Sequence, residues 1–104
     1  MNSHVVIFRA RHHADIGADY LPTVLHLKDK AMQEYGCLEF LYATTPEGEE
    51  VAITLWPDTA SILRWKADQE HRQAQRDNGL WYTAYRIQVG EIHRDYGHTH
   101  SAST

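Results

Sequence analysis

The stretch CLEFLYATTPEGEEVAITLW, residues 37–56, carries the pattern that decides the fold. Its two halves alternate with a period of two, which is typical of β-strands. Pro46-Glu47-Gly48-Glu49 lies between them and is a turn signal. We therefore expect strands over residues 37–45 and 50–56, joined as an antiparallel hairpin. The second strand is apolar on both sides, with Val51, Ile53 and Leu55 on one and Ala52, Thr54 and Trp56 on the other.

A helix is expected on each side of this hairpin. Residues 19–35 repeat apolar side chains with the helical period, and Gly36 stands where a glycine commonly ends a helix. Pro57 follows the hairpin, and Asp58 or Thr59 is expected to cap a second helix. That helix is expected to continue weakly to Gln75 and to stop at Asn78-Gly79.

Residues 4–11 and 81–96 complete the pattern as the first and last strands. In the last strand the alternation shifts across Gly90, which predicts a β-bulge there. The order βαββαβ is that of a ferredoxin-like α+β domain, which has an antiparallel sheet with helices on one face. We expect one domain over residues 1–97 and a flexible tail over residues 98–104.

The sheet is expected to be covered on both faces. Val5-Val6-Ile7-Phe8 is a continuous apolar run, which is typical of a strand buried on both sides. Helices cover only one face of a ferredoxin-like sheet. A second copy of the chain is the simplest cover for the other, so the sequence predicts a homodimer.

Composition argues against several classes of function. The 104 residues have a formal net charge of -4 and no run of Lys or Arg, which disfavours binding to nucleic acid or to a membrane surface. No apolar run approaches the roughly 20 residues that cross a bilayer. Residues 1–9 do not resemble a signal peptide, and the one cysteine, Cys37, is expected to be a small buried residue. We expect a soluble cytoplasmic protein.

One segment resembles a known family. Trp65-Lys66-Ala67-Asp68-Gln69-Glu70-His71-Arg72-Gln73-Ala74-Gln75, followed by Gly79-Leu80-Trp81-Tyr82, is similar to the antibiotic biosynthesis monooxygenase domain. Leu55-Trp56 and Ile92-His93-Arg94-Asp95-Tyr96 extend the resemblance over residues 4–96. The resemblance implies a dimeric α+β barrel with a small-molecule pocket between the sheet and helices of each subunit. Some members oxidise aromatic polyketides with molecular oxygen and no metal or flavin, relatives cleave haem, and many others have no assigned reaction.

His71 is the candidate catalytic residue, because an imidazole can take a proton from a phenolic substrate near neutral pH. A surface or interface histidine is the alternative. Trp65, Tyr82 and Tyr85 are candidate substrate-binding residues, since their rings can stack on a planar ligand and a tyrosine hydroxyl can bind its oxygen. Trp65 equally fits the core, and Tyr85 fits packing beside Ile87 and Val89.

Arg9 and Arg86 are also candidate substrate-binding residues, as arginines that could hold an anionic ligand. Like Glu39, they lie inside predicted strands. A charged side chain on a covered face of a sheet needs a partner. The structural alternative, which we favour, is that Glu39 pairs with Arg9 or Arg86 across neighbouring strands.

No cofactor is expected. His12-His13 and His98-x-His100 lack the surrounding cysteines or carboxylates of a metal site. In haem-degrading relatives, a helical Trp is followed ten positions later by a histidine that ligates iron, and an Asn lies on the first strand. Here the residue ten positions after Trp65 is Gln75, and no Asn lies within residues 5–11. Haem is therefore less expected, although His71 could substitute for the missing ligand.

Together with these candidate residues, the resemblance implies a cofactor-independent monooxygenase that uses molecular oxygen on a small aromatic or quinone-like molecule. One alternative is a non-catalytic dimeric module that binds a small ligand, and another is a haem-binding or haem-degrading relative.

Overall fold

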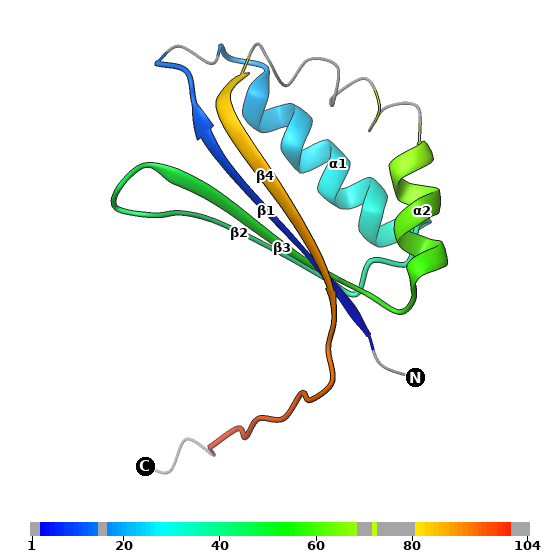
Figure 1. Cartoon of the computed structure of the whole chain (residues 1–104). Helices are drawn as coiled ribbons and strands as arrows, with labels where there is room; N and C mark the ends of the chain where they lie inside the picture. The colour runs from blue at the N-terminus through cyan, green and yellow to red at the C-terminus, as the bar shows by residue number, and fades with distance from the viewer. Residues whose placement is uncertain (1–2, 15–16, 69–71, 73–80, 101–104) are drawn as a thin grey trace.

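The computed structural model describes residues 3–14, 17–68, 72 and 81–100. Its elements follow the predicted βαββαβ order: β1 (His4–His12), α1 (Tyr20–Glu34), β2 (Glu39–Thr44), β3 (Glu49–Trp56), α2 (Thr59–Ala67) and β4 (Tyr82–Glu91) (Figure 1). The last strand ends at Glu91 rather than at Tyr96. The second helix ends at Ala67, because Asp68 has an extended backbone with φ of -61° and ψ of 138°. Most of its expected continuation to Gln75 falls on residues 69–71 and 73–75, which lie outside the described residues.

The four strands form one antiparallel sheet in the order β2-β3-β1-β4, which confirms the ferredoxin-like fold. Both helices lie on the same side of this sheet (Figure 1). We call that side the helix face and the other side the open face. On β3, every second residue is buried, from Glu50 through Ala52 and Thr54 to Trp56, and these residues point to the helix face.

A register shift lies at one end of the sheet, not at Gly90 as the sequence predicts. Gly90 pairs regularly with Val5, whereas the irregularity falls between Arg11 and His12 of β1. There, Arg11 pairs with Ala84 and His12 pairs with Tyr82, so Thr83 is the extra residue. The alternation changes after Gly90 because the strand ends at Glu91.

The core forms where the helices meet the end of β3. Trp56 is 1% exposed, and its indole N–H donates to the Thr54 hydroxyl over 2.8 Å. Its ring centroid lies 6.4 Å from that of Trp65 on α2. Ala31 and Cys37 belong to the same buried cluster, so the predicted burial of Cys37 is confirmed, and burial raises the pKa of its thiol.

Two local features hold the helices in place. The Asp58 carboxylate accepts the backbone N–H of Ser61 over 2.7 Å and caps α2, as its sequence predicts. At the other end of α2, the Asp68 carboxylate accepts a hydrogen bond from the Tyr35 hydroxyl over 2.6 Å. It also forms an ion pair with Lys30 over 3.0 Å. Because Lys30 belongs to α1, this buried contact joins the two helices.

The open face is apolar over most of its area. It presents the second set of side chains from each strand, including Val5, Ile7, Leu41, Val51, Ile53 and Leu55. None of these six side chains is buried, and Leu41 is 58% exposed. Among the described residues, neither helix combines the length and apolar character needed to cross a bilayer.

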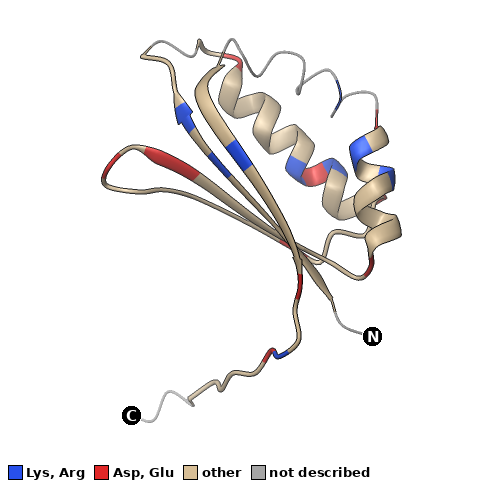
Figure 2. Cartoon of the chain, in the orientation of Figure 1, with Lys and Arg blue, Asp and Glu red and all other residues tan. Residues whose placement is uncertain are grey.

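Charged residues gather toward one end of the sheet, with basic residues on β1 and β4 and acidic residues at the start of β3 (Figure 2). The register places Arg9, Arg86 and Glu49 on the open face. Arg9 makes two hydrogen bonds of 3.0 Å to the Glu49 carboxylate, and this lowers the pKa of Glu49. The predicted pairing of Glu39 with Arg9 or Arg86 is therefore wrong. The register places Glu39 beside Leu55, whereas Arg9 lies beside Val51, and Arg86 lies on the far side of β1.

Candidate functional site

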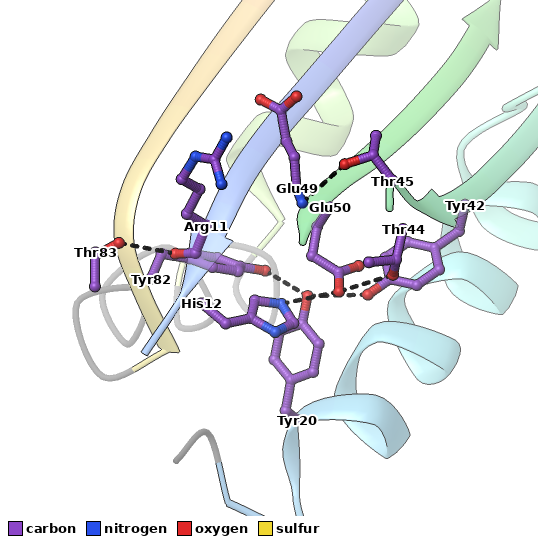
Figure 3. A network of polar contacts seen from close by, with 10 residues as sticks. All are labelled: Arg11, His12, Tyr20, Tyr42, Thr44, Thr45, Glu49, Glu50, Tyr82 and Thr83. Atoms are coloured by element: carbon purple, nitrogen blue, oxygen red, sulfur yellow. Dashed lines mark hydrogen bonds and ion pairs between the residues drawn. The ribbon is translucent and has the colours of Figure 1, made fainter. Parts of the chain in front are cut away.

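A carboxylate lies on the helix face at the start of β3, where burial is unfavourable for a charge. Glu50 is 6% exposed, and its Oε1 accepts a hydrogen bond from the Thr44 hydroxyl over 3.0 Å. His12, the last residue of β1, brings Nε2 to 3.4 Å from the same oxygen (Figure 3). A histidine and a glutamate thus face one another at the end of the sheet, with Thr44 as a third partner.

Three tyrosine hydroxyls adjoin this pair, and we call Tyr20, Tyr42 and Tyr82 the tyrosine cluster. Tyr20, the first residue of α1, lies in the middle. Its hydroxyl is 2.9 Å from that of Tyr82 on β4 and 3.3 Å from that of Tyr42 on β2 (Figure 3). Three elements far apart in the sequence therefore bring their hydroxyls together.

The tyrosine cluster remains protonated at neutral pH. Burial, with the nearby Glu50 carboxylate, raises the pKa of Tyr42 to about 12. Burial likewise raises the pKa of Tyr20 and of Tyr82 well above the ordinary value for a phenol. Each hydroxyl can therefore both donate and accept a hydrogen bond.

Aromatic rings surround these polar groups. The ring of His12 meets the edge of Tyr20 at a centroid distance of 4.7 Å, and Trp81 lies 5.3 Å from Tyr20. Phe8 lies 5.4 Å from Tyr82 and 6.1 Å from Tyr85. Flat rings beside neutral hydroxyls suit recognition of an aromatic molecule that carries an oxygen.

Two atoms of the site have unused hydrogen-bonding capacity. His12 Nε2 and Glu50 Oε2 are both buried, and neither has a hydrogen-bond partner. The 3.4 Å contact between the two side chains is close enough for an ion pair, but its geometry does not make a hydrogen bond. Buried polar groups are nearly always paired, so this pair departs from the usual rule.

The structure brings together two of the predicted site residues. Thr83 is an extra residue in its strand, so Tyr82 and Tyr85 both point to the helix face although they are three apart. Trp65 instead packs on Trp56, and Trp56 and Glu50 stand at opposite ends of β3, about 20 Å apart at about 3.3 Å per residue. Its alternative role in the core is the one that its contacts support.

Arg9 and Arg86 lie on the open face, where they are register neighbours. The sheet separates them from the tyrosine cluster, so the predicted substrate-binding residues do not form one site. His71, the predicted catalytic residue, and Gln75, which takes the haem-ligand position, lie outside the described residues.

Sequence reasoning did not select Glu50, His12, Tyr20 or Tyr42. A signal for Glu50 is present, because it shares the alternation of Ala52, Thr54 and Trp56 and must therefore point to the same face. A carboxylate on the helix-facing side of a central strand needs a partner. The identity of that partner depends on strand register, which the sequence alone does not give.

Comparisons with known proteins identify similar folds. No protein-family model matches the sequence, and the search of curated proteins gives no match either. The crystal structure of a "putative antibiotic biosynthesis monooxygenase" from Deinococcus radiodurans matches with a TM-score of 0.79 and 18% identity, covering 93% of this chain and 99% of that chain.

Two further structures match in the same way. A protein of the same description from Caulobacter crescentus CB15 has a TM-score of 0.78 and 15% identity, over 89% of this chain and 92% of that chain. Rv0793 from Mycobacterium tuberculosis has a TM-score of 0.75 and 14% identity, over 97% of this chain and 99% of that chain. The resemblance seen in the sequence is thus confirmed at the level of the fold.

Proposed function

We propose that this protein is a cofactor-independent monooxygenase that oxidises a small phenolic or quinone-like molecule with molecular oxygen. The observation that carries the proposal is the tyrosine cluster beside a buried glutamate–histidine pair, on the face that the helices cover. The shared fold with proteins described as monooxygenases supports the same class of reaction. Fold alone would not be sufficient, because one fold serves many functions.

The site offers what such a reaction needs from a protein. Loss of a proton makes a phenolic ring electron-rich, and its carbon can then donate electrons to molecular oxygen. One oxygen atom enters the ring, and the other leaves as water. Neutral tyrosine hydroxyls can donate hydrogen bonds to the substrate oxygen as its negative charge develops, which lowers the energy of the transition state.

Oxygen uptake by the purified protein with anthrone-type phenols tests the proposal. We expect uptake that depends on the protein, and we expect Tyr82→Phe to lower its rate by about 100-fold to 1000-fold, because one donor to the developing charge is lost. Tyr96→Phe is the matched control, since Tyr96 is 88% exposed and lies beyond the sheet. Absence of uptake, or equal loss in both variants, would contradict the proposal.

A non-catalytic ligand-binding role is the second candidate, and one observation favours it. The helix-face side chains of β4 beyond Tyr82 are apolar and about half exposed, namely Tyr85, Ile87 and Val89. These residues could bind an apolar ligand without any chemistry. A thermal-shift screen that finds stabilising aromatic ligands, without oxygen uptake for any of them, would support this role instead.

The protein is also proposed to act as a homodimer. The apolar open face would cost free energy if it stayed in water, and a second copy supplies a surface of the same composition. In that arrangement, the charged end around Arg9 and Glu49 would lie at the border of the interface.

A further inference from the structure

The two ring nitrogens of His12 have different surroundings, because only one of them faces Glu50. Glu50 faces one ring nitrogen of His12, at 3.4 Å from Nε2. A carboxylate in that position favours a proton on the nitrogen that it faces, which sets the tautomer and the orientation of the ring. The other nitrogen, Nδ1, is then the one that can accept a proton.

Nδ1 is available for that task. The His12 side chain keeps 20% of its surface exposed, and Nε2 is the ring nitrogen that is buried without a hydrogen-bond partner. No hydrogen bond among the described residues occupies Nδ1. An imidazole with one nitrogen toward a buried carboxylate and the other unoccupied has the arrangement of a general base.

The neighbouring elements add hydroxyl groups to this pair. β2 contributes Thr44 and Tyr42, α1 contributes Tyr20, and β4 contributes Tyr82. These four hydroxyls are uncharged at neutral pH. His12 and Glu50 therefore face one another among hydroxyls that keep their protons at neutral pH.

We infer that His12 is the general base for a phenolic ligand, and that Glu50 is the residue that positions and stabilises it. The inference rests on the proposed function and names the substrate class as phenols with an ionisable hydroxyl. The O–H bond of the ligand breaks, an N–H bond forms at Nδ1, and the electron pair stays on the phenolate oxygen. The ring of Tyr82, which borders His12 at a centroid distance of 5.6 Å and is partly exposed, offers an aromatic surface to the ligand.

Binding of 4-nitrophenol tests the inference without any need for oxidation, because its phenolate is yellow and its neutral form is not. The experiment uses a pH at which the free phenol is mostly protonated. We expect the wild-type protein to raise the phenolate absorbance on titration. His12→Asn should lower the phenolate-to-phenol ratio of the bound ligand by at least about tenfold, which corresponds to one unit in the pKa of the ligand.

Two further variants complete the experiment. Glu50→Gln should lower the phenolate yield while 4-nitrophenol still binds, because the neutral amide no longer stabilises the imidazolium. His93→Gln is the matched control, since His93 is exposed beyond the end of the sheet, and its phenolate yield should equal that of wild type. Circular dichroism checks that each variant is folded. If Glu50→Gln does not fold, His12→Asn alone decides the result.

The outcomes separate this inference from the proposed function. Unchanged phenolate yield in folded His12→Asn would overturn the assignment of the base, as would binding of 4-nitrophenol in its neutral form or no binding at all. A phenolate signal that needs His12, with no oxygen uptake for any anthrone-type phenol, would uphold the base and refute only the monooxygenase.

Discussion

Replacement of Lys30 by Met tests whether the ion pair between Lys30 and Asp68 joins the two helices. The side chains of Lys30 and Asp68 are only 14% and 6% exposed, and 3.0 Å separates their charged atoms. Removal of one partner of a buried pair costs about 3–5 kcal/mol, because the other charge is left behind in the interior. Tyr35 still donates a hydrogen bond to the Asp68 carboxylate. We therefore expect the free energy of unfolding to fall by about 3 kcal/mol, the lower end of that range.

That loss is a large share of the free energy of unfolding, which is about 5–15 kcal/mol for a typical domain. At about 4 °C per kcal/mol, the Tm should fall by about 12 °C. Urea unfolding followed by tryptophan fluorescence measures the change in the free energy of unfolding. Trp65 on α2 is a suitable probe, because its ring packs against Tyr35, which donates to Asp68. Lys28→Met is the matched control, because it removes a lysine from the same helix at a position that makes no ion pair within the described part of the chain.

A double-mutant cycle with Asp68→Leu separates the pair from its surroundings. The double variant should recover part of the loss, since both buried charges are gone, with a coupling energy of about 1–3 kcal/mol. If Lys30→Met cost no more than Lys28→Met, or if the two substitutions simply added, the ion pair would not join the helices and the reasoning would be refuted.

Three more predictions concern pH and assembly. Folding raises the pKa of Tyr20, so as the pH rises this phenol loses its proton in the unfolded chain before it does in the folded protein. The free energy of unfolding should therefore fall as the pH rises above about 10. Tyr20→Phe should lessen that fall in denaturant titrations. The Ser61 N–H lowers the pKa of Asp58, so the cap stabilises α2 above about pH 4 and is lost as the pH falls further; Asp58→Ser should give a flatter Tm between about pH 4 and 2, and an equal slope would count against the cap. Light scattering should give twice the chain mass of 12.0 kDa for wild type and a monomer for Ile53→Lys on the open face, whereas a monomeric wild type would refute the homodimer.

Local patterns in the chain predict most of the fold. The alternation in residues 37–56, the turn between its halves and the helical repeat on each side need only neighbouring residues for their interpretation. Gly36 at the end of α1, with φ of 77°, and Asp58 at the start of α2 are equally local signals. The limits of the last strand and its bulge depend on pairing with β1, and there the sequence prediction was wrong.

The candidate site depends on contacts that no local pattern reveals. Tyr82 and Tyr85 were selected for their chemistry, but they share a face only because Thr83 is an extra residue opposite β1. Arg9 and Arg86 were selected in the same way, and the register sets them on the opposite face of the sheet. A shift of one residue in a strand reverses the face of every side chain, so alternation alone cannot assemble a site from several strands.

By itself, then, the sequence determined the order of elements and the two-sided apolar character of the sheet, because both arise from interactions between residues close in the chain. Only the tertiary structure decided that His12, Tyr20, Glu50 and Tyr82 meet. They come from three strands and a helix, and the pairing of those strands fixes the distance of each side chain from the others. The hairpin that defines the fold also begins β3 with Glu50, the buried charge around which the site is arranged.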